Sequence, residues 1–132
     1  MTQEDRELLL KDLCARLPYG VKYMDILNTD EYPSTLQSID ECGLVMASDG
    51  FSLEIENVKP YLFPLSSMTD EQREEFNSFF ASVQYYGDNE REYVVPYYFV
   101  ELLIDFFHKN HIDNNGLIPM GLALDATGKN IY

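Results

Sequence analysis

The sequence predicts an α+β fold, in which a small antiparallel sheet follows an N-terminal helix and precedes two further helices and a second hairpin. Strand patterns are grouped between residues 21 and 62 and do not alternate with helices, which is typical of α+β proteins. An Asp-Gly turn and a helix-capping sequence mark element boundaries. The length of 132 residues suits one domain, divided into residues 1–18, 19–64 and 65–132.

Residues 1–18 are expected to form the first helix. Thr2 can cap its N-terminus. Four leucines recur at helical spacing and indicate the buried face: Leu9, Leu10, Leu13 and Leu17. Asp12 and Arg16 lie one turn apart and are expected on the solvent side. Cys14 borders the apolar face, so a packed thiol is expected there.

Residues 19–64 are expected to form the sheet. The candidate strands are Val21–Leu27, Thr35–Ile39, Leu44–Ala47, Phe51–Ile55 and Val58–Leu62. Asp49-Gly50 is a strong hairpin signal between the third and fourth strands. Pro60 limits the fifth strand to an edge or a bulge. A short helix followed by up to five strands is also compatible with an SH3-like or Sm-like barrel, an analogy of fold that carries no function.

Residues 65–132 are expected to hold a helix, a hairpin, a central helix and a packed tail. Thr69 to Gln72 form a full capping-box sequence for the first of these helices. Hairpin strands are expected at Val83–Gly87 and Glu92–Val95. Residues 97–111 are apolar around most of a helix, so we expect this helix to be buried and the sheet to pack against it. The tail at 117–124 is expected to be irregular chain with a short strand.

The charge balance disfavours two classes of partner. The chain has 23 acidic and 9 basic residues, a net charge of −14 and a pI near 4.2. This charge opposes direct binding to nucleic-acid phosphates and to anionic membranes. The acidic N-terminus lacks a signal-peptide pattern, so we expect a cytoplasmic protein whose two cysteines are reduced.

Four residues near the end of the central helix could hold a divalent metal or support catalysis: Glu101, Asp105, His108 and His111. The simpler interpretation is a solvated polar stripe, with His near the negative end of the helix. We favour the stripe, because no second cluster of ligands is apparent in the sequence. No catalytic residue, metal or cofactor is therefore expected.

The sequence favours a non-enzymatic, acidic accessory or protein-interaction protein. Its candidate contact residues lie on the acidic face of the sheet and in the second hairpin: Glu54, Glu56, Tyr85, Tyr86 and Tyr93. A sharper form of this hypothesis is an inhibitor that mimics nucleic acid and presents carboxylates to a basic protein. The alternative is a small enzyme or metal-binding protein that uses the four residues of the central helix. Direct nucleic-acid binding is disfavoured, because the net charge of −14 opposes contact with phosphates.

Three stretches of the chain carry a resemblance to a known family: KDLCARLPYGVK, IENVKPYLFPLSSMT and HIDNNGLIPMGLALDA. In these stretches, within residues 7–22, 55–69 and 108–126, the chain resembles a family of small uncharacterised proteins of gut Bacteroides-type bacteria and their phages or prophages. Phe63 stands where the family usually has Arg, and Ile112 stands where it has an aromatic residue. The resemblance implies a phage or mobile-element origin, and it implies no activity, catalytic residue or cofactor.

Overall fold

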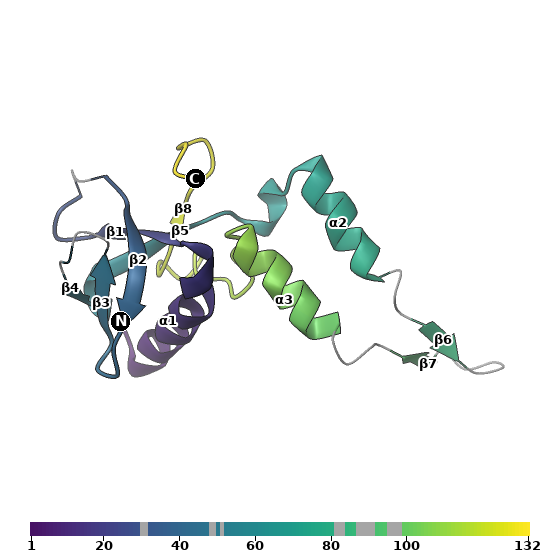
Figure 1. Ribbon diagram of the computed structural model, residues 1–132, viewed down its shortest axis with the longest axis horizontal. Helices are drawn as coiled ribbons and strands as arrows, with labels where there is room; N and C mark the ends of the chain where they lie inside the picture. The colour runs from purple at the N-terminus through teal and green to yellow at the C-terminus, as the bar shows by residue number, and fades with distance from the viewer. Residues whose placement is uncertain (30–31, 48–49, 51, 81–83, 87–91, 95–98) are drawn as a thin grey trace.

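The α+β fold is confirmed. The computed structural model describes residues 1–29, 32–47, 50, 52–80, 84–86, 92–94 and 99–132. Within them lie an N-terminal helix, a six-stranded sheet, a two-stranded hairpin and two further helices. The molecule is elongated, with the sheet and helix α1 at one end (Figure 1). Helices α2 and α3 stand side by side beyond them, and the hairpin lies at the far end.

Helix α1 (Gln3–Arg16) begins with the predicted cap and continues into a 3-10 turn, η1 (Leu17–Tyr19). The Asp5 N–H donates to Thr2 Oγ1 at 3.0 Å, and the Thr2 N–H donates to Asp5 Oδ2 at 3.1 Å. The two bonds satisfy N–H groups that a helix end otherwise leaves without partners. Gly20 follows with a φ of 68°, the left-handed conformation that glycine adopts without strain.

The main sheet has the order β4-β3-β2-β1-β5-β8. Its strands are β1 (Lys22–Asp25), β2 (Ser34–Ile39), β3 (Leu44–Ala47), β4 (Ser52–Glu54), β5 (Val58–Leu62) and β8 (Leu124–Asp125). Neighbouring strands are antiparallel except β5 and β8, which are parallel. A 3-10 turn, η2 (Ile55–Asn57), leads from β4 into β5. The predicted strands are therefore present, and the ends that can be compared differ by at most two residues; Phe51, the first residue predicted for β4, and Asp49 of the predicted turn lie outside the described residues.

Strand β2 changes partners along its length. Its first residues pair with β1, as in Tyr23 with Ser34, and its later residues pair with β3, as in Ile39 with Val45. The register shifts between Leu36 and Ser38, where an irregularity of this kind bends a strand. The meander β1-β2-β3-β4 therefore curves, and β5 returns beside β1. In the described residues β8 pairs with the other side of β5, so the sheet ends at β4 and β8, and the SH3-like or Sm-like barrel stays a prediction.

The helix that packs on the sheet is α1, so the prediction that the sheet packs against the helix at 97–111 is wrong. Leu9 and Leu13 of α1 lie in the core with residues of the sheet and the tail. The core consists of Leu9, Leu13, Val21, Tyr23, Leu36, Val45, Ile55, Val58, Leu62, Leu117, Leu122 and Ala123. Helix α3 (Phe99–Lys109) instead packs beside α2 (Asp70–Phe80), where Phe106 contacts Phe76 and Phe79. The apolar pattern of a helix indicates that the helix is buried, but it does not indicate which other element covers it.

Helices α2 and α3 belong to an excursion that leaves the sheet at Phe63 and returns at His111. The Phe63 N–H donates to the His111 carbonyl and the Asp113 N–H donates to the Phe63 carbonyl, both at 2.8 Å. Phe63 and Ile112 form a parallel β-bridge at this point. The excursion contains η3 (Leu65–Ser67), α2, β6 (Gln84–Tyr86), β7 (Glu92–Val94) and α3. We refer to residues 64–110 as the excursion.

The remaining local predictions have mixed outcomes. The second capping box is confirmed, because the Gln72 N–H donates to Thr69 Oγ1 at 3.1 Å and the Thr69 N–H donates to Gln72 Oε1 at 2.9 Å. Cys14 and Cys42 are free thiols, as expected, but Cys14 is exposed and not packed. No helix in the described ranges is long and apolar enough to cross a membrane.

Candidate functional site

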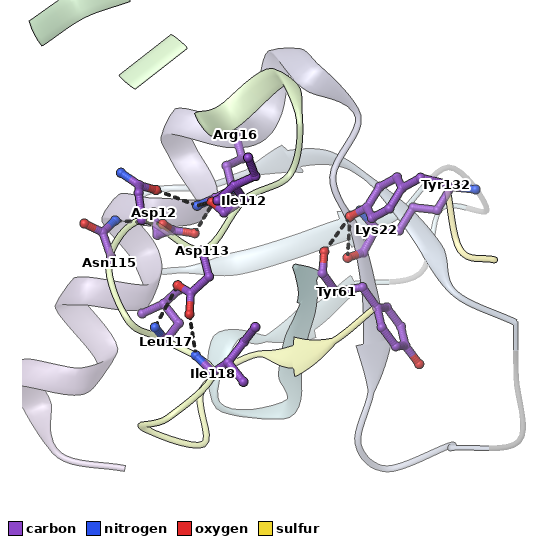
Figure 2. A network of polar contacts seen from close by, with 11 residues as sticks. Asp12, Arg16, Lys22, Tyr61, Ile112, Asp113, Asn115, Leu117, Ile118 and Tyr132 are labelled. Carbon is purple, nitrogen blue, oxygen red and sulfur yellow. Dashed lines mark hydrogen bonds and ion pairs between the residues drawn. The ribbon is translucent and has the colours of Figure 1, made fainter. Parts of the chain in front are cut away.

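A buried polar network joins the end of α1 to the tail that follows α3. Arg16 is 0% exposed and Asp12 is 2% exposed. Arg16 Nε donates to Asp12 Oδ2 at 2.7 Å, and Arg16 Nη2 donates to the Ile112 carbonyl at 2.7 Å and to Asn114 Oδ1 at 2.8 Å. Asn115 Nδ2 donates to Asp12 Oδ1 at 2.8 Å (Figure 2). The prediction that Asp12 and Arg16 face solvent is therefore wrong.

The positions of these residues on α1 explain their burial. Leu9, Asp12, Leu13 and Arg16 follow the spacing i, i+3, i+4 and i+7, which places all four on one face of the helix. That face contacts the core and the tail. The sequence contained evidence for the burial of Asp12 and Arg16, because they alternate with the two leucines along the apolar face of the helix. An exposed i, i+4 ion pair has the same spacing, which is why the pair was placed on the surface.

Asp113 organises the tail next to this network. Its Oδ1 accepts the Leu117 N–H at 2.8 Å and its Oδ2 accepts the Ile118 N–H at 2.9 Å (Figure 2). Both oxygens of this buried carboxylate are therefore used to fold the turn that follows it. Both oxygens of Asp12 are likewise bonded, so the buried carboxylates hold chain segments together and none of their oxygens is left without a bonded partner.

Two histidines border the network, and both are held towards the neutral form. Burial, followed by the nearby Arg16 guanidinium, lowers the pKa of His108 below its ordinary value. Burial, and then the charges of Arg16 and Lys22, lowers the pKa of His111 from 6.5 to about 4. The His111 ring stacks on Tyr132 with ring centroids 3.7 Å apart and an angle of 11° between the planes. Neutral imidazoles are consistent with this cationic surrounding.

Tyr132 completes the hydrogen-bond ladder between β1 and β5. These strands pair Tyr23 with Pro60 and Met24 with Lys59, so the next pair in register is Lys22 with Tyr61. The Lys22 N–H donates to the Tyr132 hydroxyl oxygen at 2.9 Å, and that hydroxyl donates to the Tyr61 carbonyl at 2.7 Å (Figure 2). The hydroxyl therefore bridges two backbone groups at the position where the next ladder pair would lie.

Replacing Tyr132 by phenylalanine is expected to lower the free energy of unfolding by about 1 kcal/mol, because the Lys22 N–H and the Tyr61 carbonyl lose their shared partner. The ring and its stack on His111 are retained in this variant. Urea unfolding of the two proteins measures the difference. A Tyr19→Phe variant, in which a surface hydroxyl that donates to Asp105 is removed, is the control and should change stability less. Equal stability of Tyr132→Phe and the parent protein would contradict the bridge.

Acid should destabilise the protein through His111. Its folded-state pKa of about 4 lies below the ordinary value of 6.5, so the unfolded chain binds more protons between these two values. The stability contributed by the neutral ring is complete above 6.5 and is lost as the pH falls to about 4. The urea midpoint of the parent protein should fall as the pH is lowered through this range, and the midpoint of His111→Asn should fall less. Asparagine tolerates the φ of 57° at this position. An unchanged slope in His111→Asn would contradict the assignment.

The structure separates the four residues proposed as a metal or catalytic group. Glu101 and Asp105 are exposed, His108 is buried, and His111 lies in the tail against Tyr132. Asp105 and His108 share a neighbour, because the Tyr19 hydroxyl donates to Asp105 and the Tyr19 ring lies 6.4 Å from that of His108. Among the described residues, no group of three or more His, Cys, Asp or Glu side chains could hold a metal ion.

The candidate contact residues of the sheet and hairpin have different outcomes. Glu54 is exposed on β4, at the edge of the sheet. Glu56 lies in η2 and accepts Arg6 Nε at 2.7 Å, so its charge is locally paired. In the hairpin, Tyr85 of β6 pairs in register with Tyr93 of β7, and Tyr86 is the next residue of β6. The side chains of these three tyrosines lie outside what the structure describes.

Helix α3 has exposed apolar residues that were not expected from the sequence: Val100 and Ile104, one turn apart, and Leu102 on another side of the helix. Val100, Leu103, Ile104 and Phe107 follow the spacing i, i+3, i+4 and i+7, and we call them the outer seam. Val100 is 56% exposed and Ile104 is 40% exposed, while Leu103 and Phe107 are half-buried. The buried residues Phe99 and Phe106 lie on the inner side of the helix. The continuous apolar pattern of this helix suggested full burial and hid the difference between the two sides.

Segments that are far apart in the chain meet at the polar network: residues 11–22, 55–69 and 111–126. Asp12 and Arg16 come from the first segment, Phe63 from the second, and the residues from Ile112 onwards from the third. The chain matches no protein-family model, no curated protein and no solved structure.

Proposed function

We propose that this protein is an acidic, non-enzymatic accessory or protein-interaction protein of phage or mobile-element origin, and that it works in the cytoplasm. The observation that carries the proposal is the exposed outer seam of α3. A helix of a small domain normally turns such a seam towards the rest of the fold, because burying apolar area is favourable. A second seam left open on the same helix is a feature of protein contact surfaces.

The polar residues support the same conclusion. Asp12 and Arg16 are buried and bond α1 to the tail, and the buried Asp113 accepts two N–H groups within the tail. They are therefore used to join α1 to the tail and to fold the tail. The exposed carboxylates Glu101 and Asp105 flank the outer seam, where they can contact a partner. Mimicry of nucleic acid is the sharper form of this proposal, and it requires that charge, more than apolar contact, determines binding.

Capture of partners from a host lysate, at low and at high salt, tests the proposal. The decisive variant is Val100→Ser with Ile104→Ser, which removes the two most exposed apolar side chains of the seam without changing charge. The matched control is Ile26→Ser with Leu27→Ser, which removes exposed apolar side chains from the turn after β1. We expect a protein that the parent and the control capture and the seam variant does not.

The salt series separates the two forms of the proposal. Binding that persists at high salt indicates an apolar contact, while binding that is lost as salt rises indicates mimicry of nucleic acid. Melting curves of both variants establish that each is folded before capture is compared. If the seam variant and the parent capture the same proteins in the same amounts, the outer seam is not the contact surface and the proposal loses its main support.

A further inference from the structure

Helix α3 has a buried inner side and the outer seam, of which the fold covers one end, because the Phe107 ring lies 6.0 Å from the Phe76 ring of α2. The inner side is buried: Phe106 contacts Phe76, Phe79 and Phe107 at ring distances of 5.6 to 6.1 Å. The outer seam continues around the helix from Phe107 and becomes more exposed towards Ile104 and Val100. The spacing i, i+3, i+4 and i+7 is the one by which helices pack against other helices. The geometry of the surface therefore fits a helix as its occupant.

The charges around the outer seam are mainly negative. Glu101 and Asp105 lie one turn apart on α3, next to the seam, and both are exposed. The acidic first half of α2 lies beside the C-terminal end of α3, where Gln72 donates to Asn110 and Glu75 accepts from Lys109, at the opposite end of α3 from Val100. Lys109, the basic residue of α3 other than His108, donates to Glu75 at 2.6 Å, so its charge is already paired. An occupant would therefore gain from positive charges beside its apolar stripe.

We propose that the outer seam binds a cationic amphipathic helix of a partner protein. This inference rests on the proposed function and names the class of partner. A second copy of the chain would bring a net charge of −14 against the same charge. An anionic membrane surface would be repelled for the same reason. A cationic amphipathic helix can place apolar side chains on the outer seam and positive charges beside the carboxylates. Nucleic acid can do neither.

The length of α3 sets the length of the contact. Its 11 residues span about 16 Å, at about 1.5 Å per residue. A partner helix of about three turns covers this span, with apolar residues facing Val100 and Ile104 and with lysine or arginine facing Glu101. The partner's polar side then remains in solvent.

A labelled lysine–leucine peptide of about 18 residues, designed to be amphipathic as a helix, is the probe. A scrambled peptide has the same composition without segregated lysine and leucine, and a third peptide has glutamate in place of lysine. Fluorescence anisotropy measures the affinity of each for the full chain. We expect the amphipathic cationic peptide to bind at least about tenfold more tightly than either comparison peptide.

The variants assign binding to the seam. Val100→Ser with Ile104→Ser should weaken binding of the amphipathic peptide about tenfold, and Ile26→Ser with Leu27→Ser should leave it unchanged. Glu101→Gln should reduce the dependence of binding on salt, while Glu41→Gln, in the turn between β2 and β3, should not. Equal binding of the scrambled peptide, or equal binding by the seam variant, would overturn the inference.

Failure of this inference can be told apart from failure of the proposed function. If no peptide binds but a lysate protein is still lost on substitution of Val100 and Ile104, the seam is a contact surface for another class of partner. In that case the cationic helix is wrong and the interaction function stands. If neither the peptide nor any lysate protein depends on these residues, both are wrong.

Discussion

Replacing Arg16 by methionine should lower the free energy of unfolding by about 3–5 kcal/mol, because it leaves the Asp12 carboxylate buried without its charged partner. The same change removes the donors to the Ile112 carbonyl and to Asn114. Methionine keeps the apolar stem of the side chain and ends two atoms short of the guanidinium nitrogens, so the effect measures mainly the lost bonds, with a smaller contribution from the space left behind. Urea unfolding at neutral pH gives the difference.

Two further variants show whether the loss comes from the stranded carboxylate. Asp12→Leu combined with Arg16→Met removes both charges and should be more stable than Arg16→Met alone, because no charge is left buried without a partner. Lys109→Gln removes one member of an exposed pair with Glu75 and should cost less than about 1 kcal/mol. If Arg16→Met were as mild as Lys109→Gln, the buried network would not be holding the tail to α1.

Replacing Leu13 by alanine should cost about 2–5 kcal/mol, through lost transfer energy and the cavity left behind. Leu13 is 0% exposed and packs in the core beneath the sheet. Leu103→Ala is the matched comparison, since it makes the same chemical change in the half-buried outer seam of α3. It should cost clearly less, because less of that side chain is removed from water in the folded protein.

The comparison decides which helix the sheet depends on. Both variants are measured by urea unfolding, with a check that the slope with denaturant is unchanged. A larger loss for Leu103→Ala than for Leu13→Ala would mean that α3, and not α1, supports the core. That outcome would also imply that the outer seam is buried in solution, and it would remove the basis of the proposed contact surface.

Local features of the chain were predictable from the sequence. Strands β3 and β5 occupy the predicted residues, and the Thr2 cap and the capping box of Thr69 and Gln72 form as expected. Each of these features depends on residues a few positions apart, such as Thr69 with Gln72. Apolar patterns and turn residues act over the same short range, so the sequence displays them directly.

Contacts between distant residues were not predictable in this way. Arg16 bonds to Ile112 across 96 positions, and Lys22 bonds to Tyr132 across 110. The spacing of an Asp and an Arg one helical turn apart does not indicate whether the pair is exposed to solvent or buried by a distant segment of the chain. The role of α3 was misjudged for a related reason, because a strongly apolar helix can be buried by its own chain or by a partner.

The two bonds that join Phe63 to the return of the chain at His111 and Asp113 also bear on how this protein can vary. Because the excursion starts and ends at one point, its interior can change in length without moving the strands that hold its ends. The entropic cost of closing a loop rises only slowly with its length. The sheet, α1 and tail can therefore serve as a constant frame, while helices α2 and α3, which carry the proposed contact surface, vary in length and sequence.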